Sequence, residues 1–258
     1  MTRHVSADAS FAKYQERGAY HWREIGPHLL GHNAFTAERY RLVADRANLV
    51  HGQHVLDYGC GDGALLSVLA RRAPRSVTLH GYDPNALAIQ YADAALRARG
   101  IRTTLYESSV AIAPESFDAI VCTEVIEHAS VPGDLLRDIA RLLKPGGRLV
   151  ITTPIRLTEF PEDPNHVQEW FPTEFGRLFE PAAWRVVSQE EVVPCAAPEA
   201  YFWRPPVFAR VPVFRLLCNA LSICAGVNAM TWLRVRPRLF MMQIVVAEKM
   251  SAATINRN

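Results

Sequence analysis

Short apolar runs alternate with amphipathic segments through the centre of the chain. The apolar runs predict strands at His54–Tyr58, Val77–Tyr82, Thr103–Tyr106, Ala119–Cys122 and Arg148–Thr153. Between them, apolar residues recur at three- and four-residue spacing, which predicts helices at Ala64–Arg72, Asn85–Arg99 and Gly133–Leu143. Repeated strand–helix units predict an α/β fold with a mostly parallel sheet that is covered by helices.

Outside these units, strands and helices no longer alternate regularly along the sequence. Lys144-Pro145-Gly146-Gly147 predicts a helix stop and a turn, and Thr173–Leu178 predicts a helix with Thr173 as its N-cap. Two further strands, Trp184–Val193 and Leu239–Glu248, bring the predicted sheet to seven strands. The chain then divides into an N-terminal helical cap, a domain of strand–helix units, an insertion that is basic and apolar, and a final strand with a tail, at 1–50, 51–195, 196–238 and 239–258.

Composition narrows the class of protein. The chain has 258 residues, 49% of them hydrophobic, which favours one large domain with an insertion. The formal net charge of +2 is too mild to indicate a nucleic-acid partner. The N-terminus has no apolar signal segment, and the five cysteines have no CxxC pair, so we expect reduced thiols in the cytoplasm.

A glycine-rich loop follows the first predicted strand. It has the spacing Gly59-x-Gly61-x-Gly63, with Asp57 at the strand end, and Asp83 ends the next strand. Glycines allow a sharp turn close to a ligand, a carboxylate at Asp57 suits a cationic group, and Asp83 could accept both hydroxyls of a ribose. Two structural interpretations stay open: a tight turn at the glycines, and Asp83 as a helix N-cap followed by Pro84.

Four segments, taken in order, resemble the class I methyltransferase family, which has a Rossmann-like fold. They are VLDYGCGDG, GYDPN, FDAIVCTEVIEH and LLKPGGRLVITTP. The resemblance implies S-adenosylmethionine as the cofactor, with the first segment along its methionine part, Asp83 on the ribose and Ser109 at the position that contacts adenine. The cofactor-binding residues expected on this basis are Asp57, Gly59, Gly61, Asp62, Asp83, Pro84, Ser109, Thr123 and Glu124.

The third segment also carries a Glu-x-x-Glu-His element. Glu124, Glu127 and His128 would share a face on one helical turn, and His166 follows the fifth strand. The element is similar to one in ubiquinone-pathway O-methyltransferases and one in small-RNA 2′-O-methyltransferases. Two carboxylates and two imidazoles could hold a divalent metal, with Mg²⁺, Mn²⁺ or Zn²⁺ all possible. The second resemblance implies that all four residues are its ligands. Without a metal, His128 or His166, with Glu124, would act as catalytic residues, or a histidine would be a structural hydrogen-bond partner.

The insertion is basic and rich in aromatic residues. From Ala200 to Val246 the sequence has six arginines and no acidic residue. Three interpretations compete: a lid over the acceptor pocket, a peripheral contact with anionic lipid through 200–238, and an RNA-binding surface.

The leading prediction is an S-adenosylmethionine-dependent methyltransferase that O-methylates a hydroxyl of a small molecule, a sugar or a lipid-linked intermediate. The alternatives are a metal-dependent RNA 2′-O-methyltransferase and a non-catalytic methyltransferase-like subunit. The glycine spacing and Asp57 argue against a nicotinamide oxidoreductase. The acceptor and the oligomeric state are not predicted.

Overall fold

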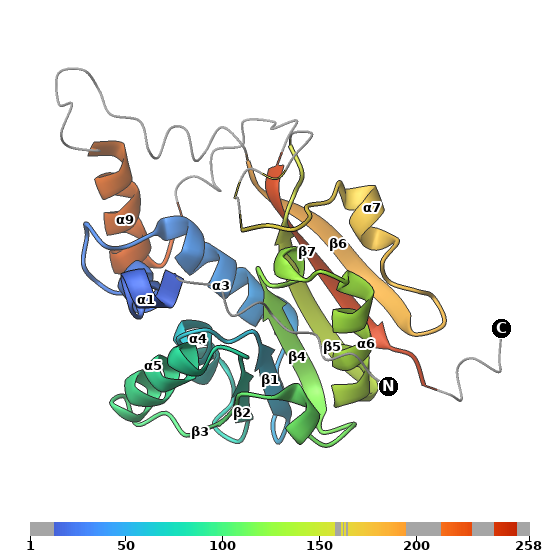
Figure 1. Ribbon diagram of the computed structural model, residues 1–258. Helices are drawn as coiled ribbons and strands as arrows, with labels where there is room; N and C mark the ends of the chain where they lie inside the picture. The colour runs from blue at the N-terminus through green and yellow to red at the C-terminus, as the bar shows by residue number, and fades with distance from the viewer. Residues whose placement is uncertain are drawn as a thin grey trace.

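A seven-stranded sheet forms the centre of the protein in a computed structural model, which describes residues 13–157, 161, 163, 165–194, 213–228 and 240–251 (Figure 1). The strand order is β3-β2-β1-β4-β5-β7-β6, and β7 is antiparallel to both of its neighbours. The predicted α/β fold with a mostly parallel sheet is therefore confirmed. The strands are β1 His54–Tyr58, β2 Thr78–Tyr82, β3 Thr103–Tyr106, β4 Phe117–Thr123, β5 Leu143–Pro154, β6 Trp184–Pro194 and β7 Phe240–Lys249.

Helices cover both faces of the sheet. They are α1 Lys13–Arg17, α2 Tyr20–Glu24, α3 Ala34–Ala47, α4 Ala64–Arg72, α5 Ala86–Arg97, α6 Pro132–Leu142, α7 Pro172–Gly176 and α9 Val213–Ala225. Two short 3₁₀ turns, η1 Ser109–Ala111 and η2 Ile126–His128, follow β3 and β4.

Strand β4 has buried apolar side chains on both faces of the sheet, so both faces must be covered by helices. Its side chains alternate between two apolar cores: Phe117, Ile120 and Cys122 pack towards α6 and α7, whereas Ala119 and Val121 pack towards α3, α4 and α5. A strand buried on both faces reads as a continuous apolar run, which is why the sequence predicted it.

Two local predictions about the ends of elements are wrong. The predicted helix stop is confirmed, because α6 ends at Leu142. The predicted turn is wrong, because β5 begins at Leu143 and includes Lys144 to Gly147 in a bulge opposite Phe117 and Ala119. Thr173 is not an N-cap. The N-cap of α7 is Phe171, whose N–H donates to the Glu174 carboxylate at 3.1 Å.

The helix α9 lies within the predicted insertion and packs beside α3 (Figure 1). It ends at Ala225, and Gly226 follows with a left-handed φ of +64°. The rest of the insertion, at 196–212 and 229–238, lies outside the described residues. Among the described helices, none combines the length and apolar character that crossing a membrane requires.

Candidate cofactor and acceptor site

The glycine-rich loop joins β1 to α4 at the carboxyl edge of the sheet. Gly59, Gly61 and Gly63 have φ of +81°, +53° and +80°, a region that side chains disfavour. A Cβ on Gly59 would lie 2.4 Å from the Val125 side chain, so this position also requires glycine for space. Val125 follows β4, and the cofactor loop and the Glu-x-x-Glu-His element are therefore direct neighbours.

Asp83 supports the loop from the end of β2. Its Oδ2 accepts a hydrogen bond from the Gly61 N–H and its Oδ1 one from the Asn85 N–H, both at 2.9 Å. The interpretation of Asp83 as a helix N-cap is wrong, because the helix starts at Ala86 and Asn85 accepts from its first free N–H groups. Pro84 lies before this cap rather than at the first helical position, and it is exposed.

The carboxylate of Asp57 is one of the unsatisfied groups of the site. It is buried at the end of β1, and neither carboxylate oxygen has a hydrogen-bond partner among the described residues. Burial, followed by the charges of Asp83 and Asp62, raises the pKa of Asp57 well above its usual value. Such a carboxylate is suited to a cationic group from a ligand.

Three residues of the N-terminal helices contact the cofactor loop. The His21 N–H donates to Asp62 Oδ2 at 3.0 Å, and the Trp22 indole N–H donates to the Asp62 carbonyl at 2.6 Å. The hydroxyl of Tyr14 lies 2.1 Å from the place where a Cβ on Gly61 would stand. The sequence did not predict these contacts, because they join residues about 40 positions apart without a local pattern. The Asp62 carboxylate, which we expected at the cofactor, is engaged by the cap.

The other predicted cofactor residues surround the same edge. Ser109 begins η1 after β3. Thr123 is the last residue of β4. These placements are compatible with the predicted roles, which stay predictions.

Glu124 stands apart from the turn that follows it. Its φ is +54°, and it precedes η2, so the predicted single helical turn through Glu124, Glu127 and His128 is wrong. Its carboxylate accepts a hydrogen bond from the Thr152 hydroxyl at 3.0 Å and lies 3.3 Å from Nη1 of Arg39 on α3. Arg39, which the sequence did not single out, places a half-buried guanidinium at the strand ends, and its Nε, which is buried, has no partner among the described residues.

Glu127, His128 and His166 converge beside Glu124. One ligand atom from each of the three lies within 4.8 Å of the other two, a group that leaves out Glu124. Glu127 is fully buried, and its Oε2 accepts from the Thr153 hydroxyl at 3.2 Å, while its Oε1 has no partner among the described residues. Burial and the neighbouring Glu124 raise the pKa of Glu127 well above its usual value.

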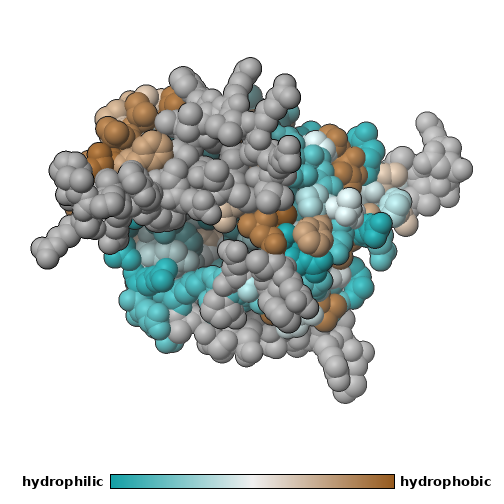
Figure 2. Space-filling view, turned by 90° about the horizontal axis from the view of Figure 1, so that it is seen from above, coloured by the Kyte–Doolittle hydropathy of each residue, from teal (hydrophilic) through white to brown (hydrophobic). Residues whose placement is uncertain are grey.

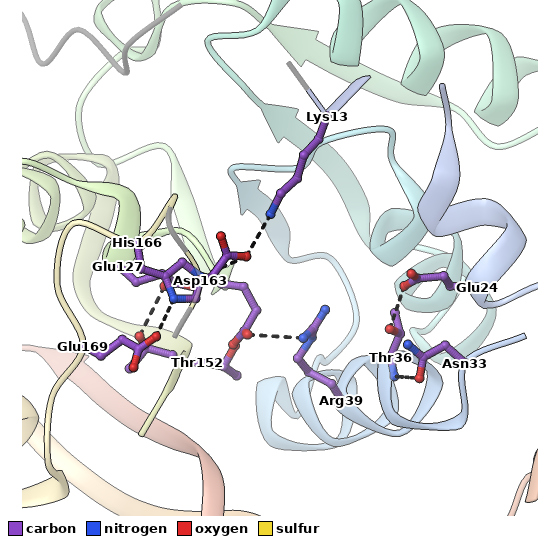
Figure 3. Close-up of polar contacts among 12 residues, drawn as sticks. Lys13, Glu24, Asn33, Thr36, Arg39, Glu127, Thr152, Asp163, His166 and Glu169 are labelled. Atoms are coloured by element: carbon purple, nitrogen blue, oxygen red, sulfur yellow. Dashed lines mark hydrogen bonds and ion pairs between the residues drawn. The ribbon is translucent and has the colours of Figure 1, made fainter. Parts of the chain in front are cut away.

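Each of the two histidine rings contacts an oxygen atom through its Nδ1. His128 Nδ1 lies 2.8 Å from the carbonyl oxygen of Asn165. His166 Nδ1 lies 2.6 Å from a carboxylate oxygen of Glu169 (Figure 3). The two rings are 5.0 Å apart. Burial lowers the pKa of His128, which favours its neutral form.

Comparison with known protein families identifies the family of this chain. A family profile described as a methyltransferase domain matches residues 21–190, which include the glycine loop, Asp83 and the converging histidines. The chain belongs to the methyltransferase family. This membership agrees with the four sequence segments, which predicted a methyltransferase.

Curated relatives of this methyltransferase share its central part. It is 28% identical over 155 residues to the ubiquinone biosynthesis O-methyltransferase of Aliivibrio fischeri. The aligned region covers 59% of this chain and 66% of that relative. It is 30% identical over 149 residues to the enzyme of the same name from Klebsiella pneumoniae, with 56% and 60% covered. The match thus spans less than two thirds of either relative.

A solved structure supports the fold. An S-adenosylmethionine-dependent methyltransferase from Aquifex aeolicus superposes with a TM-score of 0.55 at 16% identity, covering 84% of this chain and 98% of that one. The Rossmann-like class I fold is therefore confirmed for this methyltransferase.

Proposed function

We propose that this methyltransferase transfers a methyl group to a hydroxyl of a small molecule. The observation that carries the proposal is the convergence of Glu127, His128 and His166 next to the glycine loop. A hydroxyl is a poor nucleophile at neutral pH and needs a proton acceptor or a metal, whereas an amine needs mainly positioning. The relatives from Aliivibrio fischeri and Klebsiella pneumoniae, which are named as O-methyltransferases, agree with this choice.

The cofactor side of the proposal rests on the two carboxylates at the ends of β1 and β2. Asp57 would pair with the ammonium of the methionine part, because its buried carboxylate has no partner among the described residues. Asp83 would accept the ribose hydroxyls while its backbone contacts hold the loop. When bound, S-adenosylmethionine supplies an electrophilic methyl group.

The acceptor side rests on the imidazoles. His128 is kept neutral by burial and could take the proton from the acceptor hydroxyl. Arg39 and Glu124 would line the opposite wall and orient the acceptor, since their ion pair stands at the end of β4. Close positioning then supplies the rest of the rate enhancement.

A divalent metal fits the same group. Glu127 Oε1 has no protein partner among the described residues and two imidazoles lie within reach, so Glu127, His128 and His166 would hold the ion. Two nitrogen donors and one oxygen donor suit Mn²⁺ or Zn²⁺ better than Mg²⁺. A bound metal would ease deprotonation of the acceptor hydroxyl.

The test measures S-adenosylmethionine turnover with catechol, sugar and RNA acceptors, with and without a chelator. We expect turnover of a small-molecule hydroxyl and a loss of at least about tenfold on chelation, restored by Mn²⁺ or Zn²⁺. Activity that is insensitive to chelation would remove the metal and leave the histidine base. Turnover of RNA alone, or of an amine alone, would overturn the proposed acceptor class.

We further propose that α9 gives the protein a peripheral contact with anionic lipid. Leu217 and Leu221 on this helix are exposed, and so is Leu30 in the neighbouring loop before α3. Figure 2 shows apolar atoms on the side where Figure 1 has α9. An apolar face in a stretch of sequence without acidic residues is typical of interfacial elements.

A further inference from the structure

The face of the sheet that packs against α6 is partly open over β1, β2 and β3. The helices α4 and α5, which follow β1 and β2, pack on the other face. On the α6 face, the chain passes from β3 to β4 through the three-residue turn η1. A cavity of about 390 Å³ lies there, and its lining includes His54, His80, Tyr106, Phe117 and Lys144, one residue from each of the strands β1 to β5.

This cavity is separate from the candidate cofactor and acceptor site. His54 is the first residue of β1, and Lys144 lies near the start of β5, which runs in the same direction. The glycine loop instead follows the last residue of β1. None of the residues to which a role at the carboxyl edge is assigned lines the cavity. A ligand bound here would therefore be distinct from the methyl donor and the acceptor.

Two histidines face each other in the lining of the cavity. His54 Nδ1 lies 3.3 Å from His80 Nε2. The strands β1 and β2 are parallel neighbours, and Leu56 is the register partner of His80. His54 comes two residues before Leu56, so both histidines lie on the same face of the sheet, on a diagonal. The backbone of the two strands thus sets the separation of the two rings.

The separation of the two nitrogens matches that of two ligands of one metal ion. In a tetrahedral site, Zn²⁺ lies about 2.0–2.1 Å from an imidazole nitrogen, which places two such nitrogens about 3.3–3.4 Å apart. A direct hydrogen bond between the rings would be long, because protein N–H donors usually lie about 2.7–3.2 Å from their acceptors. An ion shared by the two nitrogens therefore fits the observed spacing without a movement of either strand.

The surroundings of this histidine pair are compatible with a cation. Lys144 is the positively charged side chain among the described residues of the lining, and its Nζ is paired with Asp118 Oδ1 at 2.7 Å. The other carboxylate oxygen of Asp118 accepts a hydrogen bond from the His54 N–H at 2.8 Å. A negative charge is therefore held next to His54 and offsets the ammonium.

The His80 ring has a second contact that can orient it. The Tyr106 hydroxyl lies 3.4 Å from His80 Nδ1, the nitrogen that does not face His54. A polar partner on the far nitrogen is typical of imidazoles that bind metals. In the described part of the chain, no third His, Cys, Asp or Glu completes the pair. The remaining coordination positions would be filled by water, for which the cavity has room.

We propose that His54 and His80 form a binding site for a divalent transition metal, Zn²⁺ or Cu²⁺. Imidazole nitrogens suit these two ions, whereas Mg²⁺ and Ca²⁺ prefer oxygen ligands. The site is separate from the metal group proposed at Glu127, and it does not depend on the proposed function.

The decisive experiment uses crystals of the full wild-type chain grown with Zn²⁺, with anomalous diffraction measured at the zinc absorption edge. We expect an anomalous peak about 2.0–2.1 Å from both His54 Nδ1 and His80 Nε2. No peak between these two atoms would overturn the proposal. Because the wild-type chain is used, the result does not depend on whether a variant folds.

Calorimetric titration with Zn²⁺ tests the site in solution. We expect His80→Gln to lose one bound Zn²⁺ per chain, or to bind it at least about tenfold more weakly, with unchanged affinity for S-adenosylmethionine. The control is His51→Gln, which removes an exposed histidine that contacts Ser76 just before β1. Equal Zn²⁺ binding by His80→Gln and the wild type would refute the site.

The His166→Gln variant separates this site from the metal group proposed at Glu127. We expect His166→Gln to keep the Zn²⁺ that His80→Gln loses. If His166→Gln binds no Zn²⁺ at all, the His54–His80 site is refuted and the metal at Glu127 stands. If His166→Gln binds as much Zn²⁺ as the wild type while His80→Gln binds none, the His54–His80 site stands and the metal at Glu127 is refuted.

Discussion

The buried carboxylate of Asp57 destabilises the folded protein, although the same carboxylate is suited to binding a cationic group of a ligand. Because its pKa is raised by burial, the unfolded chain releases the proton above about pH 3.9, while the folded state retains it. Stability therefore falls as the pH rises from that value towards the folded-state pKa. The ligand-free protein carries this penalty at neutral pH.

The Asp57→Asn variant should consequently be more stable and less able to bind cofactor. We expect its Tm at pH 7 to rise by about 2–4 °C, the shift for roughly 1 kcal/mol in a chain of this length, with the gain shrinking towards pH 4. Affinity for S-adenosylmethionine should fall at least about tenfold, because a charge-assisted contact is lost. Thermal unfolding and calorimetry measure both, with Asp93→Asn on exposed α5 as the control. A lower Tm with unchanged affinity would contradict the assignment.

The site residues that were predicted from the sequence share a local pattern. The glycines of the loop, Asp57 and Asp83 stand at strand ends with fixed spacing, so their placement follows once the strands are known. The contacts of Arg39 and Tyr14 had no such signal. Their roles come from contacts between separate elements, and a single sequence does not specify which helix faces which strand end.

At the scale of elements, one ion pair joins the cap to the far edge of the sheet. Arg46 near the end of α3 donates two hydrogen bonds to Glu190 on β6, at 2.8 and 2.7 Å. The hydrogen bond from Arg46 lowers the pKa of Glu190. The stabilisation is thus fully present above the unfolded-state value of about 4.3 and is lost as the pH falls through the folded-state pKa.

The Glu190→Gln variant should lower the free energy of unfolding by at most about 1 kcal/mol at pH 7, because both side chains are about one-third exposed and screened by water. The difference should vanish at acidic pH and shrink in high salt. Urea unfolding beside the neighbouring Glu191→Gln variant tests this expectation. An equal loss at pH 3 would show that packing, rather than charge, is responsible.

Element boundaries were the weakest part of the sequence prediction. The strands were placed correctly because burial on both faces leaves a continuous apolar run. The bulge in β5 was missed since glycine and proline signal a turn equally well. The cap of α7 was missed because Glu174 reaches back to a backbone N–H, and the preceding phenylalanine carries no capping side chain.

For the whole molecule, the position of α9 decides what the exposed surface can do. Its Asn219 amide donates to the Leu29 and His32 carbonyls at 2.8 and 2.9 Å, and the His32 ring contacts the Ser222 hydroxyl at 2.9 Å. These polar contacts fix the helix to the cap. No periodicity in the sequence could have predicted them, because they join loops and helices about 190 residues apart.

Because α9 is held in this way, its exposed leucines should act as a fixed surface. We expect the protein to sediment with vesicles that contain anionic phospholipid at low salt and less so at high salt. A Leu217→Ser and Leu221→Ser double variant should lose most of this binding while keeping its activity. Val50→Ser, another exposed apolar position, is the control. Equal binding to neutral vesicles, or none by the wild type, would refute the contact.

The hydrogen bond between the Trp22 indole and the Asp62 carbonyl has a kinetic consequence. In the proposed function, each catalytic cycle would release the spent cofactor and admit a fresh one past a loop to which the cap is bonded. If the loop opens only when this bond and the His21 contacts break, then the residence time of the product is set by how often the cap lifts. The pace of the enzyme would then be governed by an opening motion, and faster chemistry alone would not increase its turnover.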